Sequence, residues 1–284
     1  MPQPIVQPVD IQKYQATQKQ CTTDLLAVEE PLEIRLGYGP VHQRKVMQLS
    51  LTMRTPGHDF ELAIGLLLAE GIIDSYQQVF QIKYCTSEDS HEISPNIVRV
   101  ELQAGHCFDT NRLKRNLLAN SSCGICGKAS IEAIQMTACP ALPKETIQIN
   151  PAVLLSLPER LQEAQQVFGY TGGLHATALF EKEANILFAR EDIGRHNSVD
   201  KVIGAALYKN LLPLHSQVML VSGRAGFELI QKAVKAGVSV FCAIGAPSSL
   251  AVDTAKAFGL TLVGFLRNQQ FNVYSGEWRI ANKK

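Results

Sequence analysis

The sequence predicts an α/β protein, and its second half carries the observations that favour this class. Short apolar strands are expected at 218–222, 238–244 and 260–265, with helices at 227–235 and 249–258 between them. Each strand runs into a turn that contains glycine or polar residues. Apolar strands that alternate with helices in this way indicate a sheet covered on both faces by crossover helices.

The composition is that of an ordinary globular protein from a reducing compartment. The chain has 284 residues, 46% hydrophobic and 19% charged, with a formal net charge of +1. This net charge produces no global field that would attract nucleic acid or an anionic membrane, so neither is expected as a partner. The seven cysteines are odd in number and mostly scattered, which disfavours a secreted disulfide framework. We therefore expect a soluble, cytoplasmic protein.

The first half mixes strand and helix patterns. Residues 1–21 are rich in glutamine and proline, lack the apolar region of a signal peptide, and are expected to form a flexible tail. Strands are predicted at 32–36, 46–53 and 97–102, and helices at 59–73 and 111–119. The proline-rich segment 139–151 indicates a domain boundary. It divides the chain into an α+β domain, 22–145, and a second domain, 146–284.

The second domain is expected to begin with a helix, after which strands and helices alternate. The predicted elements before residue 218 are a helix at 152–167, a helix or strand at 175–180, a strand at 185–190 and a helix at 197–210. Ligands in sheets of this kind usually bind beyond the carboxyl ends of the strands. In the alternating region those ends fall at 222–226, 245–249 and 265–268.

The cysteine pair in Ser-Ser-Cys-Gly-Ile-Cys-Gly, residues 121–127, is the clearest candidate for chemistry. Cys123 and Cys126 are two residues apart, and the glycines beside them leave the sulfurs uncrowded. Four interpretations are open: buried thiols, structural zinc, a thioredoxin-like pair, and a reactive cysteine on a mobile loop. Structural zinc needs two further ligands, and no second cysteine or histidine pair follows at ligand spacing. A thioredoxin-like pair should follow a strand, but the segment before the cysteines looks helical. A reactive cysteine with a second thiol in reach fits best.

Two turns at strand ends are candidates for phosphate binding. The Ser222–Gly226 turn joins an apolar strand to a helix, where backbone N–H groups and Arg224 can hold an anion. A tight βα turn without a ligand explains the same residues equally well. The Gly245–Ser249 turn repeats the pattern, with Ser248 or Ser249 as a helix cap. Two such turns at neighbouring strand ends make a nucleotide site more credible than either alone.

Polar residues also concentrate in Glu191–Gly204, with His196 at the beginning of the predicted helix. A solvated helix face explains the charges from Asn197 onward. It does not explain the polar turn before the helix, for which a functional role is favoured. His175, beside apolar residues, is interpreted as structural, and Cys242 as a core residue.

Six motifs in this order closely resemble the formate dehydrogenase accessory sulfurtransferase family (FdhD/NarQ). They are SSCGICG, TGGLHATALF, REDIGRHNSVDKVIG, VSGRAG, GAPSSLAVD and GFLRNQQFNVYS, and the resemblance covers roughly residues 25–276. It implies a cytoplasmic homodimer with a cytidine-deaminase-like C-terminal domain and a smaller α+β N-terminal domain. Zinc deaminase chemistry is excluded, because His175-Ala176-Thr177 lacks the glutamate of H-x-E and the CxxC precedes the histidine. No permanently bound metal is expected.

The resemblance also implies a reaction. In the family a cysteine desulfurase donates sulfane sulfur to a cysteine of the CxxC loop, and the sulfur passes to molybdenum (or tungsten) bis-molybdopterin guanine dinucleotide for formate dehydrogenase. Cys123 then corresponds to the persulfide carrier and Cys126 to its helper. The segment Phe265–Gln270 resembles the family's cofactor-binding segment, and the two glycine turns are our own assignment for the guanine nucleotide portions. The residues expected at the cofactor are Phe265, Leu266, Arg267, Asn268, Gln269, Gln270, Ser222, Gly223, Arg224, Gly226, Gly245, Ser248 and His196.

Two further functions of different classes remain open. A cofactor chaperone would bind and insert the cofactor without carrying sulfur, so that Cys123 and Cys126 would be dispensable while Arg267 and the glycine turns would not. A zinc-stabilised module would hold about one metal ion per chain. The cysteine pair and the resemblance together favour a sulfurtransferase.

Overall fold

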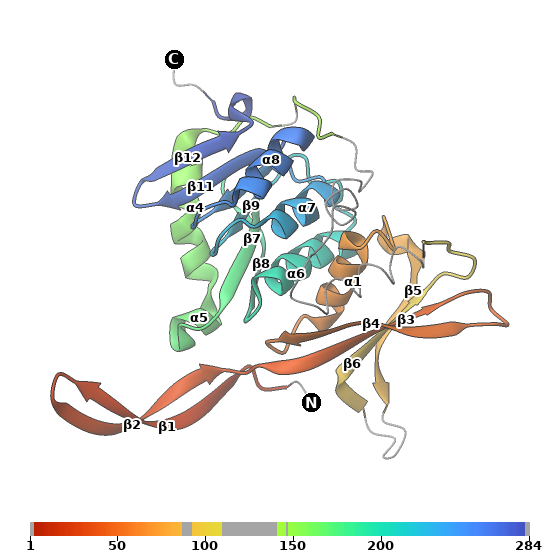
Figure 1. Cartoon of the computed structure of the whole chain (residues 1–284), viewed down its shortest axis with the longest axis horizontal. Coiled ribbons are helices and arrows are strands. Elements are labelled where there is room, and N and C mark those ends of the chain that lie inside the picture. The colour runs from red at the N-terminus through yellow and green to blue at the C-terminus, as the bar shows by residue number, and fades with distance from the viewer. Residues whose placement is uncertain (1–2, 87–92, 110–140, 146, 282–284) are drawn as a thin grey trace.

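The computed structural model describes residues 3–86, 93–109, 141–145 and 147–281. Within these residues the chain forms a long hairpin, a four-stranded sheet and a six-stranded sheet with helices on both sides (Figure 1). The α/β class is therefore confirmed. The predicted helix at 111–119 and the cysteine motif lie outside the described residues.

The four-stranded sheet has the order β4-β3-β6-β5. Its strands are β3 (Glu30–Tyr38), β4 (Lys45–Arg54), β5 (Val79–Thr86) and β6 (Ile93–Leu102). Strands β3 and β6 run parallel, and the other neighbours are antiparallel. Three of these strands confirm the predictions at 32–36, 46–53 and 97–102. Strand β5 was missed, although its apolar and polar residues alternate from Phe80 to Tyr84.

The six-stranded sheet has the order β12-β11-β10-β9-β7-β8. Its strands are β7 (His175–Phe180), β8 (Ile186–Asp192), β9 (Val218–Val221), β10 (Val240–Ala243), β11 (Thr261–Arg267) and β12 (Gln270–Ser275). Strands β9, β10 and β11 are parallel, as alternation with helices predicts. Strand β7 pairs antiparallel with both β9 and β8, and β12 pairs antiparallel with β11. The sheet is therefore mixed.

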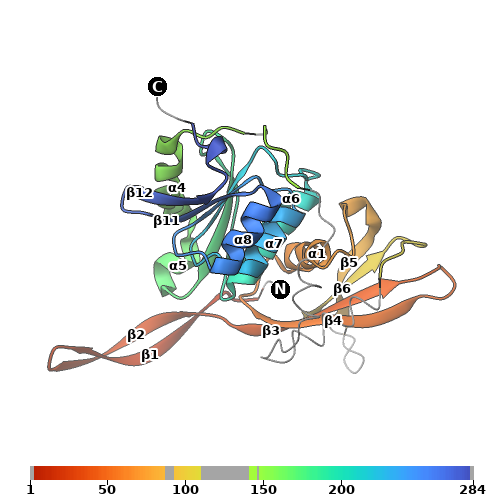
Figure 2. The same ribbon diagram turned by 45° about the horizontal axis from the view of Figure 1, so that its top comes forward.

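Helices cover both faces of this sheet, as predicted (Figure 2). Helix α4 (Pro151–Ala164) lies on one face, where Leu154, Leu157 and Leu161 pack against one set of strand residues. Helices α6 (Arg195–Tyr208), α7 (Phe227–Lys235) and α8 (Ser249–Phe258) lie on the other face. Alternate residues of β9 pack against the helices on the two faces, because successive side chains of a strand point to opposite faces. The short helix α5 (Gln166–Thr171) leads into β7.

Helix α1 (Asp59–Ala69) joins the two halves of the chain by packing against α6. The helices approach so closely that a Cβ on Gly65 would overlap the carbonyl of Asp200, and one on Gly204 would overlap that of Glu61. One continuous hydrophobic core contains residues from both sheets, from Leu32 to Leu262. The boundary that the sequence indicates at residue 145 stays a prediction.

The N-terminal segment is the main correction to the predicted fold. Residues expected to form a flexible tail instead form strands β1 (Val6–Gln15) and β2 (Gln18–Ala27), paired along their whole length. The hairpin projects from the body of the molecule and is mostly exposed (Figure 1). Because neither face is buried in a core, its sequence lacks the apolar alternation that identifies a half-buried strand. No helix in the described part of the chain is long and apolar enough to cross a membrane.

Candidate functional site

Three turns meet at the carboxyl ends of β9, β10 and β11. The N–H of Gly245 donates to the carbonyl of Gly223 at 3.0 Å, and the N–H of Ala225 donates to Ala246 at 3.1 Å. The third turn joins the first two, because the N–H of Phe265 donates to the carbonyl of Gly245 at 3.0 Å. The structure thus brings together the three segments that the sequence singled out separately.

The first two turns each begin a helix of the covering layer. Gly226 precedes α7 without a side-chain cap, and a Cβ there would meet no atom within 4 Å. Ser248 caps α8 by accepting a hydrogen bond from the N–H of Ala251 at 3.2 Å, which confirms one of the two predicted caps. The positive ends of both helix dipoles therefore lie at the turns, with the exposed Arg224 beside them. This arrangement favours an anion.

The third turn has an unusual backbone. Phe265 has φ 53°, a left-handed conformation that is rare for an aromatic residue, and it lies at a bulge between Gly264 and Arg267. Such outliers often occur at functional sites. The Arg267 guanidinium lies 5.7 Å from the centre of the half-buried Phe265 ring.

Beyond the bulge, Asn268 and Gln269 form a two-residue hairpin turn with φ 53° and 56°, as a type I′ turn requires. Arg267, Asn268, Gln269 and Gln270 are exposed and accessible to a ligand. Leu266 is not: its side chain is fully buried in the core shared with α4. Its assignment to the cofactor was wrong for the side chain, because the bulge at Phe265 breaks the alternation of β11 and Leu266 packs in the same core as Val263.

Two histidines lie at the same edge. A Cβ on Gly223 would stand 3.4 Å from Nδ1 of His175, so the ring is directly beside the first turn. Burial lowers the pKa of His175, and the charges of Arg195 and His196 lower it further. The ring is therefore neutral at pH 7. His196 pairs with Glu228 of α7, with 2.7 Å between Nε2 and Oε2, which lowers the pKa of that carboxyl.

His175 is the residue that sequence reasoning missed. It was interpreted as structural because a histidine before an apolar strand is usually a packing residue. Since β7 runs antiparallel to β9, the beginning of β7 lies at the carboxyl end of β9. One feature of the sequence could have indicated a functional role for His175: it follows Thr171-Gly172-Gly173, a glycine-containing turn directly before a strand.

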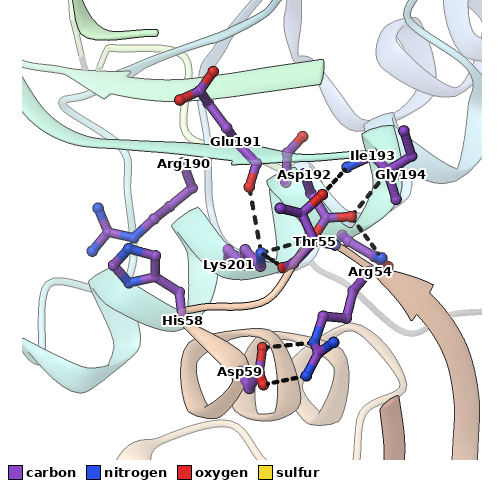
Figure 3. Close-up of polar contacts among 12 residues, drawn as sticks. Arg54, Thr55, His58, Asp59, Arg190, Glu191, Asp192, Ile193, Gly194 and Lys201 are labelled. Carbon is purple, nitrogen blue, oxygen red and sulfur yellow. Dashed lines mark hydrogen bonds and ion pairs between the residues drawn. The ribbon is translucent and has the colours of Figure 1, made fainter. Parts of the chain in front are cut away.

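The polar turn before α6 and the beginning of that helix contain a buried ion pair, Lys201 with Asp192, beside the more exposed Arg195 and His196. Lys201 and Asp192 are 1% and 0% exposed, and their Nζ and Oδ2 atoms are 2.7 Å apart. Lys201 also donates to the carbonyls of Thr55 and Glu191, and the N–H of Gly194 donates to Asp192 (Figure 3). The cluster ties the end of β4 to the beginning of α6. The solvated helix face expected from Asn197 onward was wrong for Asn197, Asp200 and Lys201, which are buried. The functional role favoured for the turn stays a prediction.

The predicted reactive cysteines, Cys123 and Cys126, lie outside the described residues. Cys242 is buried in β10, as predicted, and burial raises its pKa. Among the described residues no cluster of three histidine, cysteine, aspartate or glutamate side chains could hold a metal ion. The described residues instead gather backbone N–H groups, two helix beginnings, arginines and histidines at one edge of the sheet, a set of groups that favours an anion.

Comparison with known proteins identifies the family. The model of the FdhD/NarQ family matches residues 27–281, which include both cysteines of the CxxC motif. The chain belongs to the FdhD/NarQ family. The hairpin strands β1 and β2 lie almost wholly outside the matched residues, whereas all three turns of the candidate site lie within them.

Curated members of the FdhD/NarQ family match most of the chain. A protein of Streptomyces avermitilis named "Sulfur carrier protein FdhD" is 50% identical over 91% of this chain and 89% of its own length. Proteins of the same name from Mycobacterium tuberculosis and Saccharolobus solfataricus are 45% and 41% identical, each over 91% of this chain and over 92% and 91% of their own lengths.

A solved structure shares the fold. It is a crystal structure of a protein from Desulfotalea psychrophila, described as "a putative formate dehydrogenase accessory protein", and it aligns with a TM-score of 0.73. The alignment covers 98% of this chain and 100% of that chain at 20% sequence identity. At this identity the likeness supports the fold alone.

Proposed function

We propose that this chain is a sulfurtransferase that carries sulfur for the maturation of formate dehydrogenase. The observation that supports this most directly is its membership of the FdhD/NarQ family, together with long matches to proteins named sulfur carriers. In this proposal Cys123 receives sulfane sulfur from a cysteine desulfurase. The acceptor is the molybdenum bis-molybdopterin guanine dinucleotide cofactor, which is cargo rather than a resident group. The protein acts in the cytoplasm as a homodimer.

Two exchanges carry the sulfur. The Cys123 thiolate attacks the terminal sulfur of the desulfurase persulfide, the sulfur–sulfur bond breaks, and the desulfurase cysteine leaves as a thiolate. Cys123 then holds the sulfur as a persulfide. The Cys126 thiolate attacks the inner sulfur, forming a Cys123–Cys126 disulfide and releasing hydrosulfide, which becomes a ligand of molybdenum. A dithiol reductant supplies the two electrons that restore both thiols.

The three joined turns would hold the nucleotide end of the cargo. The beginnings of α7 and α8 and the Arg224 guanidinium suit the phosphates, because all three present N–H donors at one edge of the sheet. The neutral His175 can donate or accept a hydrogen bond beside Gly223. The strained Phe265 and the exposed Arg267 to Gln270 would contact the part of the cargo that lies further along the edge.

The same turns favour a second candidate, a chaperone that binds and inserts the cofactor without carrying sulfur. The two functions differ in what each variant loses. As a sulfur carrier, the protein needs Cys123 for activation but not for nucleotide binding. As a chaperone, it needs Arg224 and Arg267 but neither cysteine.

The test is activation of formate dehydrogenase in cells that lack their own FdhD/NarQ protein. We expect Cys123→Ala to abolish formate dehydrogenase activity while the purified variant binds guanosine diphosphate as well as wild type. Cys126→Ala should lose less activity, because a reductant can release sulfur from the Cys123 persulfide directly. Full activation by Cys123→Ala would reject the carrier and favour the chaperone.

A further inference from the structure

A cavity of about 370 Å³ lies away from the three turns, between the two halves of the chain. Its walls come from the beginning of α1, from β5, from β8 and from the end of α6. From His196 to Tyr208, α6 rises about 18 Å, so the cavity is at the opposite end of that helix from the candidate site. Its volume falls within the range of about 300–1,000 Å³ that is typical of small-molecule sites.

Aromatic rings form much of the cavity wall. Phe60 and Tyr84 lie together on one side, with ring centres 4.9 Å apart. Phe188 and Tyr208 contribute from β8 and α6, and Tyr208 is held against the ring of Tyr76 at 4.4 Å. Burial, followed by the neighbouring Asp59, raises the pKa of Tyr84 to about 12, so its phenol is neutral at pH 7. Walls of this kind suit a planar ring.

The two carboxylates at the cavity are already neutralised. Arg54 donates to both oxygens of Asp59 at 3.1 and 3.0 Å. Arg190 donates to both oxygens of Glu61 at 2.6 and 2.8 Å. Burial raises the pKa of Glu61, but hydrogen bonds from Arg190 and His58 outweigh it and lower the value to about 2. Neither carboxylate therefore repels an anion strongly.

The charge that these pairs leave over at the cavity is a single positive one, because Arg190 is already paired with Glu61. Lys209 is exposed and makes no ion pair with any residue that the structure describes. The ring of His58 and the guanidinium of Arg190 both contact Glu61 at the beginning of α1 and lie side by side (Figure 3). His58 has φ 58°, and α1 begins there without a side-chain cap, so the positive end of the α1 dipole lies at the same cavity as Lys209.

We propose that this cavity binds a planar aromatic anion, with its ring among Phe60, Tyr84 and Tyr208 and its anionic group near Lys209. Two kinds of molecule share this chemistry: a nucleoside monophosphate and an aromatic carboxylate. The inference does not depend on sulfur transfer, so Cys123→Ala should bind the ligand as wild type does.

The test is isothermal titration of the full chain with guanosine monophosphate and, separately, with 2-naphthoate. We expect saturable binding of at least one probe with a Kd below about 1 mM. Lys209→Gln and Tyr208→Ala should each weaken it roughly tenfold, whereas Lys182→Gln, an exposed lysine on another turn, should leave it unchanged. Binding of the monophosphate alone assigns a nucleotide, and binding of 2-naphthoate alone assigns a carboxylate.

Arg224→Ala separates this cavity from the candidate site. Binding at the cavity is unchanged in that variant and roughly tenfold weaker in Lys209→Gln. The proposal is overturned if neither probe binds saturably. It is also overturned if Arg224→Ala loses binding while Lys209→Gln binds as tightly as wild type. Because Lys209 is exposed, Lys209→Gln tests the proposal even if Tyr208→Ala is poorly folded.

Discussion

Replacing Lys201 with methionine tests whether the buried cluster joins the two halves of the molecule. The Lys201 side chain is 1% exposed, and its Nζ atom lies 2.7 Å from an Asp192 oxygen. It also donates to the carbonyls of Thr55 and Glu191 at 2.9 and 3.3 Å. Methionine fills a similar volume but leaves the Asp192 charge buried with only N–H donors from Thr55, Gly194 and Asn197.

Removing one partner of a buried ion pair costs about 3–5 kcal/mol, because the remaining charge is desolvated and uncompensated. We expect Lys201→Met to lower the free energy of unfolding by this amount. Lys235→Met is the matched control, since its partner Asp74 is 76% exposed and such pairs contribute at most about 1 kcal/mol. The double variant Lys201→Met/Asp192→Asn should be more stable than Lys201→Met, because it removes the uncompensated charge.

The measurement is urea unfolding followed by circular dichroism, with the slope m compared between variants. An unchanged slope with a lower midpoint indicates loss of native stability. If Lys201→Met unfolds at the same urea concentration as Lys235→Met, the cluster does not hold β4 against α6. The reasoning from burial would then be refuted.

Three further predictions address the interface, the pH dependence and the candidate site. Gly65→Ala should lower the free energy of unfolding in urea by about 1–3 kcal/mol or more, because the added Cβ overlaps the backbone of α6. Gly169→Ala is the control: its Cβ meets open space, so its stability should be unchanged or slightly higher. Hydrogen bonds from Arg190 and His58 outweigh the effect of burial and lower the pKa of Glu61 from 4.5 to about 2. Ionised Glu61 therefore stabilises the fold fully above about pH 4.5, and this contribution is lost as the pH falls to about 2. The difference in free energy of unfolding between wild type and Glu61→Gln should shrink over that range. A difference that stays constant with pH would contradict this. Arg224→Ala should weaken guanosine diphosphate binding roughly tenfold by calorimetry, and equal weakening by Lys182→Ala would remove the case for this site.

The alternating region was predictable because its pattern is local. Helices α7 and α8 occupy the predicted ranges 227–235 and 249–258 without any shift of their ends. Each lies between a short apolar strand and a turn with glycine, and each buries a regular apolar face. The three turns were each predicted at the carboxyl end of a strand, and parallel neighbouring strands end at one edge of a sheet.

The parts that were not predicted depend on pairing between distant segments. The hairpin of β1 and β2 has no buried face, so its strands leave no apolar alternation in the sequence. His175 belongs to the candidate site only because β7 runs antiparallel to β9. Asp192 and Lys201 look like solvated or functional charges until the end of β4 is placed against them. In each case the deciding contact joins residues far apart in the chain.

The central claim is that Cys123 carries sulfur, and intact-protein mass spectrometry tests it most directly. Wild type and Cys123→Ala are incubated with a cysteine desulfurase and cysteine, and their masses are compared before and after reduction. We expect wild type to gain about 32 Da, the mass of one sulfur atom, and to lose it on reduction, while Cys123→Ala gains nothing. A wild-type protein that gains no mass beside an active desulfurase, or a variant that gains as much as wild type, would contradict the account.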